Sequence, residues 1–242
     1  MIGLFQTIKN NYGACMDEKK VTQNLLSFWN DFFKELKPQN IDINDLKISN
    51  RLDELLKFLG DNSTRVLDIG TGSGYCLMMS RVFGEKIEYG LGVDPSKNAI
   101  DFIKESCKLS KISNLEFLQG DHKYLKNLQD NSFDGIICSN VLDVVTPSTA
   151  TEIIKEIDRL LKNEGYLLIK INFYLTKELI DRLKMEEIDE NTYAINNVLR
   201  GVNLTQEQWL DKFPKYDLLE SSQYERIKNG PKDRVFLLKK MP

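Results

Sequence analysis

Histidine and cysteine are scarce in this sequence, which has one histidine and four cysteines among its 242 residues. The cysteines, Cys15, Cys76, Cys107 and Cys138, lie far apart, and no pair has the spacing of metal ligands. A structural zinc site needs about four such ligands held close together. The sequence therefore predicts no metal centre, and the scattered cysteines are typical of a chain whose thiols stay reduced.

Long apolar runs and an excess of charge of one sign are also missing. No apolar run approaches the roughly 18 residues that a membrane-spanning helix needs, and the first residues do not combine a basic segment with a long apolar one. The formal net charge is −3, which argues against a polyanion such as nucleic acid as the partner. We expect a soluble cytoplasmic protein that acts away from the membrane, and we leave a homodimer open.

The apolar pattern changes its period along the chain. Apolar residues recur at helical spacing over 21–36, and a second helix is expected from a cap at Ser49 to Gly60. From 65 to 171, short apolar runs alternate with helical patterns near 74–83, 97–109 and 149–162. This alternation predicts βαβ units and a doubly wound parallel sheet within one domain.

The C-terminal part follows another pattern. We expect residues 173–204 to form helices around a polar loop, with MEEIDEN as a solvated surface, and 205–213 to form a helix capped by Thr205. The runs YDLLESSQYERI and DRVFLLKK are typical of strands, and the short turn KNGPK between them requires antiparallel pairing.

The segment VLDIGTGSGY ends a predicted strand in three glycines, Gly70, Gly72 and Gly74. The dinucleotide fingerprint G-x-G-x-x-G fails here, because the third glycine position is Tyr75 counted from Gly70 and Leu77 counted from Gly72. Glycines still permit positive φ and a close approach of backbone to a ligand. The loop is therefore a ligand site that need not hold phosphate, or else a tight turn alone.

Two acidic residues follow the next two predicted strands. Asp94 comes 20 residues after Gly74 and can accept hydrogen bonds from both hydroxyls of a ribose, or cap the following helix. Asp121 ends the third strand and can accept from the amine of an adenine, or only form a turn. Together the two acids indicate adenosine without a pyrophosphate.

In this order, VLDIGTGSGY, GVDPS, QGDHKYL, FDGIICSNVLDVV and LLKNEGYLLIKI resemble the motifs of class I S-adenosylmethionine-dependent methyltransferases, over about residues 49–172. The resemblance implies an α/β fold with a doubly wound, seven-stranded, mostly parallel sheet of order 3-2-1-4-5-7-6, whose last strand pairs antiparallel, and helices on both faces. It divides a single domain, 1–242, into an N-terminal helical extension or lid (1–48), a cofactor-binding core (49–172), and C-terminal helices with the antiparallel strand pair (173–242).

The same resemblance implies S-adenosyl-L-methionine as cofactor, S-adenosyl-L-homocysteine as product, and a set of residues around them. Asp68, Gly70, Thr71, Gly72 and Gly74 would face the methionine part, Asp94 the ribose, Pro95, Asp121 and His122 the adenine, and Ser139 and Asn140 the methionine amino group. A short match to the family's FWD- or YWD-like segment places Trp29 over the cofactor. Asp143, one short turn past the fourth strand, is the candidate general base if the acceptor arrives protonated.

Residues 139–142 read SNVL, where amino-methylating enzymes for nucleic acids and some proteins carry NPPY or DPPY. This resembles the group that acts on small metabolites by in-line displacement. We expect the acceptor to bind under residues of the N-terminal helices, of the segment after the fourth strand, and of the 173–204 segment with Tyr174, Tyr193 and Arg200. A methyltransferase acting on a macromolecule, a silent cofactor-binding regulator, and a dehydrogenase stay as alternatives. We expect Cys138 to be a packed thiol rather than a nucleophile.

Overall fold

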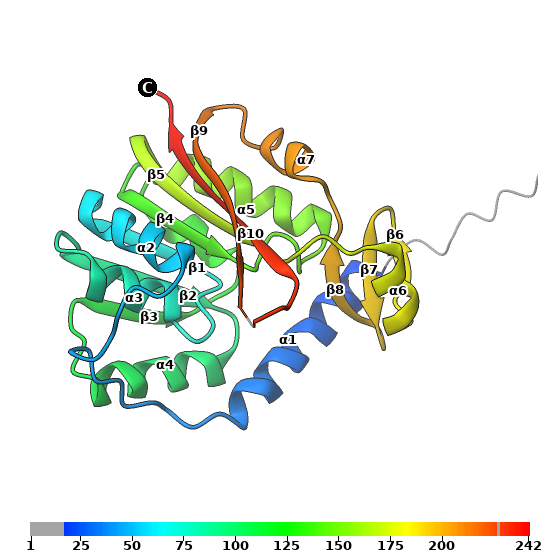
Figure 1. The fold of residues 1–242 in the computed structure, drawn as a ribbon, viewed down its shortest axis with the longest axis horizontal. Helices are drawn as coiled ribbons and strands as arrows, with labels where there is room; N and C mark the ends of the chain where they lie inside the picture. The colour runs from blue at the N-terminus through cyan, green and yellow to red at the C-terminus, as the bar shows by residue number, and fades with distance from the viewer. Residues whose placement is uncertain (1–16, 227) are drawn as a thin grey trace, which may run out of the picture.

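A seven-stranded sheet forms the centre of the molecule (Figure 1). Its strands are β1 (Arg65–Ile69), β2 (Tyr89–Asp94), β3 (Leu115–Gln119), β4 (Phe133–Ser139), β5 (Leu161–Ile171), β9 (Tyr216–Glu225) and β10 (Lys232–Lys240). In the computed structural model, which describes residues 17–226 and 228–242, their order is β3-β2-β1-β4-β5-β10-β9. β10 is antiparallel to both β5 and β9, and the other pairs are parallel. This confirms the expected order, with β9 and β10 as its sixth and seventh strands. Cys15 lies outside the described residues.

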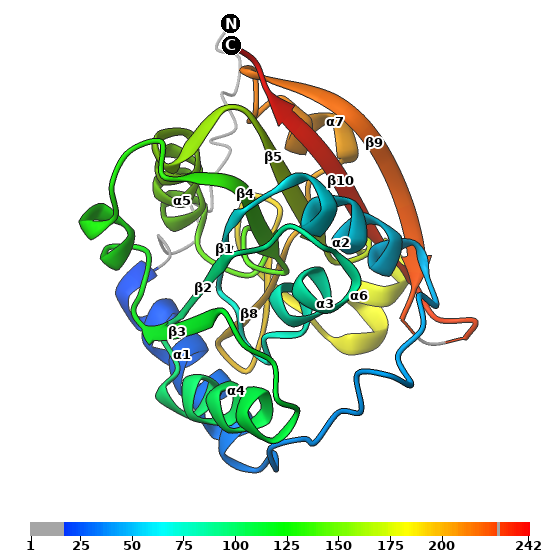
Figure 2. The same ribbon diagram turned by 90° about the vertical axis from the view of Figure 1, so that its left-hand side faces the viewer.

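Helices cover both faces of this sheet. They are α1 (Glu18–Lys34), α2 (Arg51–Asn62), α3 (Tyr75–Phe83), α4 (Lys97–Leu109), the 3₁₀ turn η1 (Tyr124–Asn127), α5 (Pro147–Leu160), α6 (Lys177–Leu183) and α7 (Gln206–Leu210). Apolar residues of α2, α3 and α4 form one core with the sheet, and those of α5 and α7 form the other. Figure 2 shows α2 and α3 on one side of the sheet and α5 on the other. The predicted two-sided α/β architecture is therefore confirmed.

The start of α2 differs by one residue from the sequence prediction. The cap is Asn50, whose side chain accepts a hydrogen bond from the Asp53 backbone N–H at 3.1 Å. Ser49, the predicted cap, instead donates its hydroxyl to the Asp53 carboxylate at 2.8 Å. Both residue types are good caps, so the sequence alone does not choose between neighbours.

The prediction of helices around a polar loop over 173–204 is wrong in its second half. Only α6 is helical there, and β6 (Glu186–Asp189), β7 (Thr192–Ile195) and β8 (Val198–Val202) form a separate antiparallel sheet beside it (Figure 1). Asn196 and Asn197, between β7 and β8, both have positive φ, at 52° and 59°. Two central residues with positive φ define the tight hairpin turn that twisted strands prefer, and asparagine tolerates this conformation. The Asn-Asn pair is the signal that the helical interpretation overlooked.

Membrane insertion has no support from the helices. None within the described parts of the chain is long and apolar enough to cross a bilayer.

Candidate active site

A cavity of about 760 Å³ opens at the carboxyl ends of the central parallel strands. Its lining includes eleven of the predicted residues, namely Trp29, Asp68, Gly70, Thr71, Gly72, Asp94, Pro95, Asp121, His122, Ser139 and Asn140. Helix α1 runs from β8 to α4 and supplies part of the wall (Figure 1). Ligands of open α/β sheets bind at this edge, where the strand order reverses.

The glycine loop after β1 has the backbone conformation that its sequence requires. Gly70, Gly72 and Gly74 all have positive φ, at 66°, 51° and 71°. A Cβ on Gly70 would lie 2.4 Å from Val141 Cγ2, and one on Gly74 would lie 2.3 Å from the Ile103 side chain. The backbone therefore makes close approaches at both positions. Gly74 is the N-cap of α3 and packs on α4, and it does not line the cavity.

Asp68 lies at the base of this loop and is 1% exposed. Its Oδ2 accepts a hydrogen bond from the Thr71 hydroxyl at 2.7 Å, which connects the strand end to the loop. Burial raises the pKa of Asp68 to about 7; the hydrogen bond from Thr71 opposes this shift, and the nearby Asp94 carboxylate adds to it. The carboxyl therefore changes charge near neutral pH at the wall of the cavity.

Asp94 ends β2 and is also buried, at 8% exposed. Its Oδ2 accepts from the Gly72 backbone N–H at 2.9 Å, and its Oδ1 accepts from the Ser96 N–H at 2.8 Å. The N-cap of α4 is Ser96, so the alternative role of Asp94 as that cap is wrong. Each carboxylate oxygen has a second lone pair, which leaves Asp94 able to accept from a ligand.

The residues after β3 form the opposite wall of the cavity. Asp121 is exposed, and its Oδ1 accepts from the Lys123 N–H at 2.9 Å in a tight turn. His122 Nε2 lies 3.3 Å from the Glu152 carboxylate. Pro95 follows the neighbouring strand β2, and its carbonyl accepts from the side chain of Gln119, the last residue of β3, at 3.2 Å. Asp121 thus forms a turn and lines the cavity at once.

Ser139 is the last residue of β4 and Asn140 follows it, with a positive φ of 54°. The Asn140 N–H donates to the Lys170 carbonyl at 2.8 Å, and Asn140 Oδ1 contacts the Lys170 ammonium. Asn140 Nδ2 is buried, and no described residue accepts a hydrogen bond from it. An unpaired buried donor costs free energy, so this amide is an observation that points to a ligand in the cavity.

Asp143, the candidate general base, does not line the cavity. It is 2% exposed, and its Oδ2 accepts from the Asn172 N–H at 2.9 Å and from the Asn172 Nδ2 at 2.7 Å. Asn172 does line the cavity. A base must reach the proton that it removes, and Asp143 is bonded to Asn172 instead. Asp143 therefore does not contact the cavity directly, and we infer that it positions Asn172.

Helix α1 is attached at both of its ends. Asn30 Oδ1 accepts from the Ser96 hydroxyl at 3.0 Å and from the Asn98 N–H at 3.3 Å at the start of α4. Two residues earlier, the Arg200 guanidinium lies 4.3 Å from the ring centroid of Phe28, and at the other end of the helix Glu18 accepts from the Ser148 hydroxyl. Trp29 lies between these attachments and faces the cavity. The helix therefore spans the cavity as a cover.

Of the three parts expected around the acceptor, the N-terminal helices and the segment after β4 line the cavity, and the 173–204 segment does not. Tyr174, Tyr193 and Arg200 do not line the cavity, and Arg200 instead contacts α1. Sequence reasoning missed Lys170, Asn172, Tyr224 and Arg226, which do line it. The same rule about strand ends predicts these four residues, because they lie at the ends of β5 and β9. The two strands run in the same direction, since each pairs antiparallel with β10.

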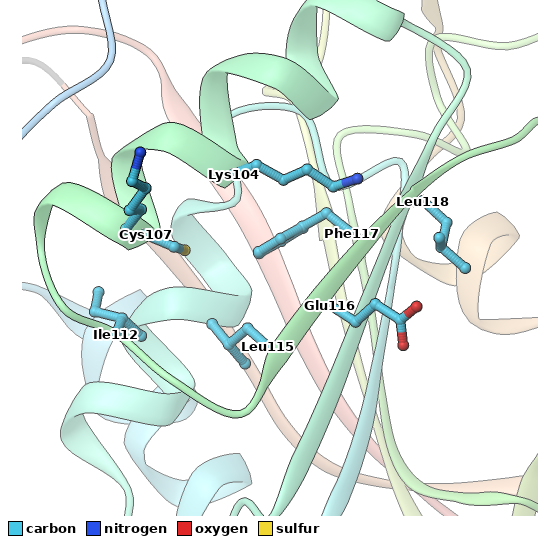
Figure 3. A pocket seen from close by; sticks show the side chains of 8 residues that line it. Lys104, Cys107, Ile112, Leu115, Glu116, Phe117 and Leu118 are labelled. Atoms are coloured by element: carbon cyan, nitrogen blue, oxygen red, sulfur yellow. The ribbon is translucent and has the colours of Figure 1, made fainter.

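A second, smaller hollow lies between α4 and the edge strand β3 (Figure 3). Its volume is about 370 Å³, and Ile112, Leu115 and Phe117 line it together with Lys104 and Cys107. It uses the start and middle of β3 rather than the residues after the strand. None of the predicted site residues lines it.

The fold and the cavity define a protein of the class I methyltransferase type. The chain matches the methyltransferase-domain family Methyltransf_31 over residues 60–222 and belongs to that family. S-adenosylmethionine is the cofactor of this class, and the carboxylates of Asp94 and Asp121, which line the cavity near the strand ends, fit its ribose and adenine.

Similar proteins agree on the fold. A 1,6-didemethyltoxoflavin-N1-methyltransferase from Burkholderia thailandensis, solved with bound 1,6-didemethyltoxoflavin and S-adenosylhomocysteine, is 16% identical, with a TM-score of 0.66 over 98% of this chain and 99% of that one. The PH0226 protein of Pyrococcus horikoshii is 22% identical, with a TM-score of 0.64 over 87% and 98%. A ribosomal protein L11 methyltransferase of Clostridium perfringens is 25% identical over 51% of this chain, which covers only 36% of that relative.

Proposed function

We propose that this protein transfers a methyl group from S-adenosylmethionine to a small-molecule acceptor. The observation that carries the proposal is that one cavity is lined both by the glycine loop with Asp94 and by apolar residues of α1 and of the segment after β4. Leu25 and Val145 are among these apolar residues. Its volume of about 760 Å³ falls within the range of about 300–1000 Å³ found for small-molecule sites. Because α1 covers the cavity, it favours an acceptor that is small enough to fit entirely inside.

Two further observations support a small acceptor. The Burkholderia protein, whose reported ligand is 1,6-didemethyltoxoflavin, aligns with almost the whole of this chain. The segment SNVL after β4 also lacks the NPPY or DPPY motif. The ribosomal protein L11 methyltransferase would favour a macromolecule, but the chain spans about a third of its length.

Bound S-adenosylmethionine supplies a methyl group on a positively charged sulfur that departs as a neutral thioether. The residues of this chain would bind and orient the reactants. Asp94 would accept from the ribose, Asp121 from the adenine amine, and Ser139 and Asn140 would meet the methionine amino group. Trp29 would exclude water. Alignment of two reactants can account for roughly 7–11 kcal/mol of a barrier, so positioning is a sufficient role for these groups.

The wider expectations form part of the same proposal. Cys76, Cys107 and Cys138 are buried free thiols, which supports a reducing compartment such as the cytoplasm. A net charge of −3 supports a partner other than nucleic acid.

The proposal is tested in two stages. Calorimetry measures binding of S-adenosylhomocysteine and of NAD, and we expect only the first to bind. Labelled S-adenosylmethionine is then incubated with a metabolite extract, bulk RNA and bulk protein in separate reactions. Label in a metabolite supports the proposal, and label only in RNA or protein contradicts it. Tight cofactor binding with label in none of the three favours a regulator.

A further inference from the structure

A buried ammonium group lies at the end of the cavity formed by β4, β5 and β9. Lys170, near the end of β5, is 5% exposed and lines the cavity. Its ammonium lies 3.1 Å from the Asp233 carboxylate and contacts Asn140 Oδ1. An ammonium carries three N–H donors, so one is left for a molecule in the cavity.

Two more donors lie beside this lysine. Asn140 Nδ2 is the buried donor for which no described residue is an acceptor. Arg226 is at the rim, with its side chain 51% exposed, and its Nε lies 2.8 Å from Asp233 Oδ2. An Arg226 terminal nitrogen also donates to Asn172 Oδ1 at 3.2 Å. All three side chains belong to residues that line the cavity.

Three carboxylates lie around these donors. Asp233, which is fully buried, receives both Lys170 and Arg226, so two cations share one carboxylate. Glu225 also lines the cavity, but it is exposed and accepts from the Asn229 N–H at 3.1 Å. The other nearby carboxylate, Asp143, is held behind Asn172 and outside the cavity. This end of the cavity therefore places spare N–H donors beside two cations that share a single buried carboxylate.

We propose that Lys170, Asn140 and Arg226 bind an oxyanion of the methyl acceptor, a carboxylate or a phosphate. The inference rests on the proposed function and names the acceptor class for it. A buried donor set is satisfied only by a ligand that brings acceptor atoms, and charge-assisted hydrogen bonds are the stronger ones. A neutral acceptor would leave the third Lys170 donor and the Asn140 amide unpaired.

The test uses matched probes on protein saturated with S-adenosylhomocysteine. Calorimetry compares benzoate and phenyl phosphate with the neutral benzyl alcohol. We expect at least one anion to bind at least 10-fold more tightly than the alcohol. Lys170→Met should remove this preference, and Arg226→Gln should reduce it several-fold. Lys232→Gln, an exposed lysine of β10 outside the cavity, is the matched control and should leave it unchanged.

The outcomes of these measurements distinguish a failure of the proposed function from a failure of the oxyanion site. If wild-type protein does not bind S-adenosylhomocysteine, the proposed function fails. If it binds but shows no preference for the anions, the oxyanion site alone is overturned. A loss of S-adenosylhomocysteine affinity of 10-fold or more in Lys170→Met, without a change in probe preference, also overturns it, because the donors then hold the cofactor's own carboxylate. If Lys170→Met fails to fold by circular dichroism, Arg226→Gln decides between these outcomes.

Discussion

The Asp94 carboxylate accepts a hydrogen bond at 2.9 Å from the backbone N–H of Gly72, a residue 22 positions earlier in the chain. This bond fixes the loop after β1 to the end of β2, and the same carboxylate faces the cavity. Ligand recognition and loop geometry therefore depend on one side chain. In its proposed role toward the ribose, Asp94 would be held in place by its contacts to Gly72 and Ser96.

Replacing Asp94 with alanine should weaken S-adenosylhomocysteine binding about 10- to 100-fold. Hydrogen bonds to a charged group contribute about 1.5–3 kcal/mol each, and the loop also loses its anchor. Calorimetry provides the measurement. Asp101→Ala, an exposed residue of α4, is the control. A change smaller than twofold in Asp94→Ala would show that the ribose is held elsewhere.

Gly74→Ala should destabilise the protein by about 2–4 kcal/mol. The new Cβ would lie 2.3 Å from the Ile103 side chain, and the φ of 71° disfavours any residue with a Cβ. Urea unfolding measures the loss. The double variant Gly74→Ala with Ile103→Ala separates the causes, because removing Ile103 methyl groups relieves the overlap but not the backbone strain. A Gly74→Ala variant as stable as wild type would contradict both causes, the overlap with Ile103 and the backbone strain.

Sequence patterns identified the central sheet and the first half of the site because both follow from local rules. Alternating periods mark the βαβ units, and the glycines and acids lie immediately after predicted strands. The β6–β8 sheet was missed because its strands are only four or five residues long, β6 is mostly acidic, and the turn signal between β7 and β8 is an Asn-Asn pair rather than a glycine.

The other half of the site depends on packing between distant segments. Lys170 resembles any lysine at a strand end until Asp233, 63 positions later, is brought within 3.1 Å of it. Asp143 is the opposite case. Its position in the sequence is suitable for a general base, but in the structure its side chain is hydrogen-bonded to Asn172. Sequence patterns place a residue at an edge, whereas the partner of its side chain is set by tertiary structure.

Asp143→Asn should lower stability while leaving cofactor binding and turnover within about twofold of wild type. The asparagine amide would face the Asn172 donors and lose one hydrogen bond, at a cost of about 1–3 kcal/mol. Urea unfolding and assays with the acceptor fraction found as above provide the measurements. A fall in turnover of 100-fold or more with intact binding would restore Asp143 as the base.

Asn30→Ala should loosen the cover that α1 provides. It removes the acceptor for the Ser96 hydroxyl and the Asn98 N–H, at about 0.5–1.5 kcal/mol for each bond. We expect faster hydrogen exchange over α1 and a several-fold faster release of S-adenosylhomocysteine. Asp31→Ala, an exposed neighbour on the same helix, should change neither quantity. Equal exchange in the two variants would contradict a cover held by Asn30.

Raising the pH from 5 to 8 should destabilise the ligand-free protein through Asp68. Burial raises the pKa of this carboxyl to about 7, from an ordinary value near 4, so over this window the folded state binds more protons than the unfolded state. Stability from this group is therefore complete below about pH 4 and is lost as the pH rises through about 7. Burial shifts the pKa values of Asp94 and Asp143 in the same direction, which adds to the slope.

The Asp68→Asn variant isolates the contribution of this residue. Asparagine keeps an oxygen for the Thr71 hydroxyl but does not titrate, so the fall in unfolding free energy between pH 5 and pH 8 should be smaller than in wild type. Urea unfolding at several pH values measures both slopes, and each pH unit of full linkage corresponds to about 1.4 kcal/mol. Glu220, whose pKa is lowered by Arg51, stays ionised throughout and leaves the comparison unaffected. Identical slopes in the two proteins would mean that Asp68 is ionised across the whole range.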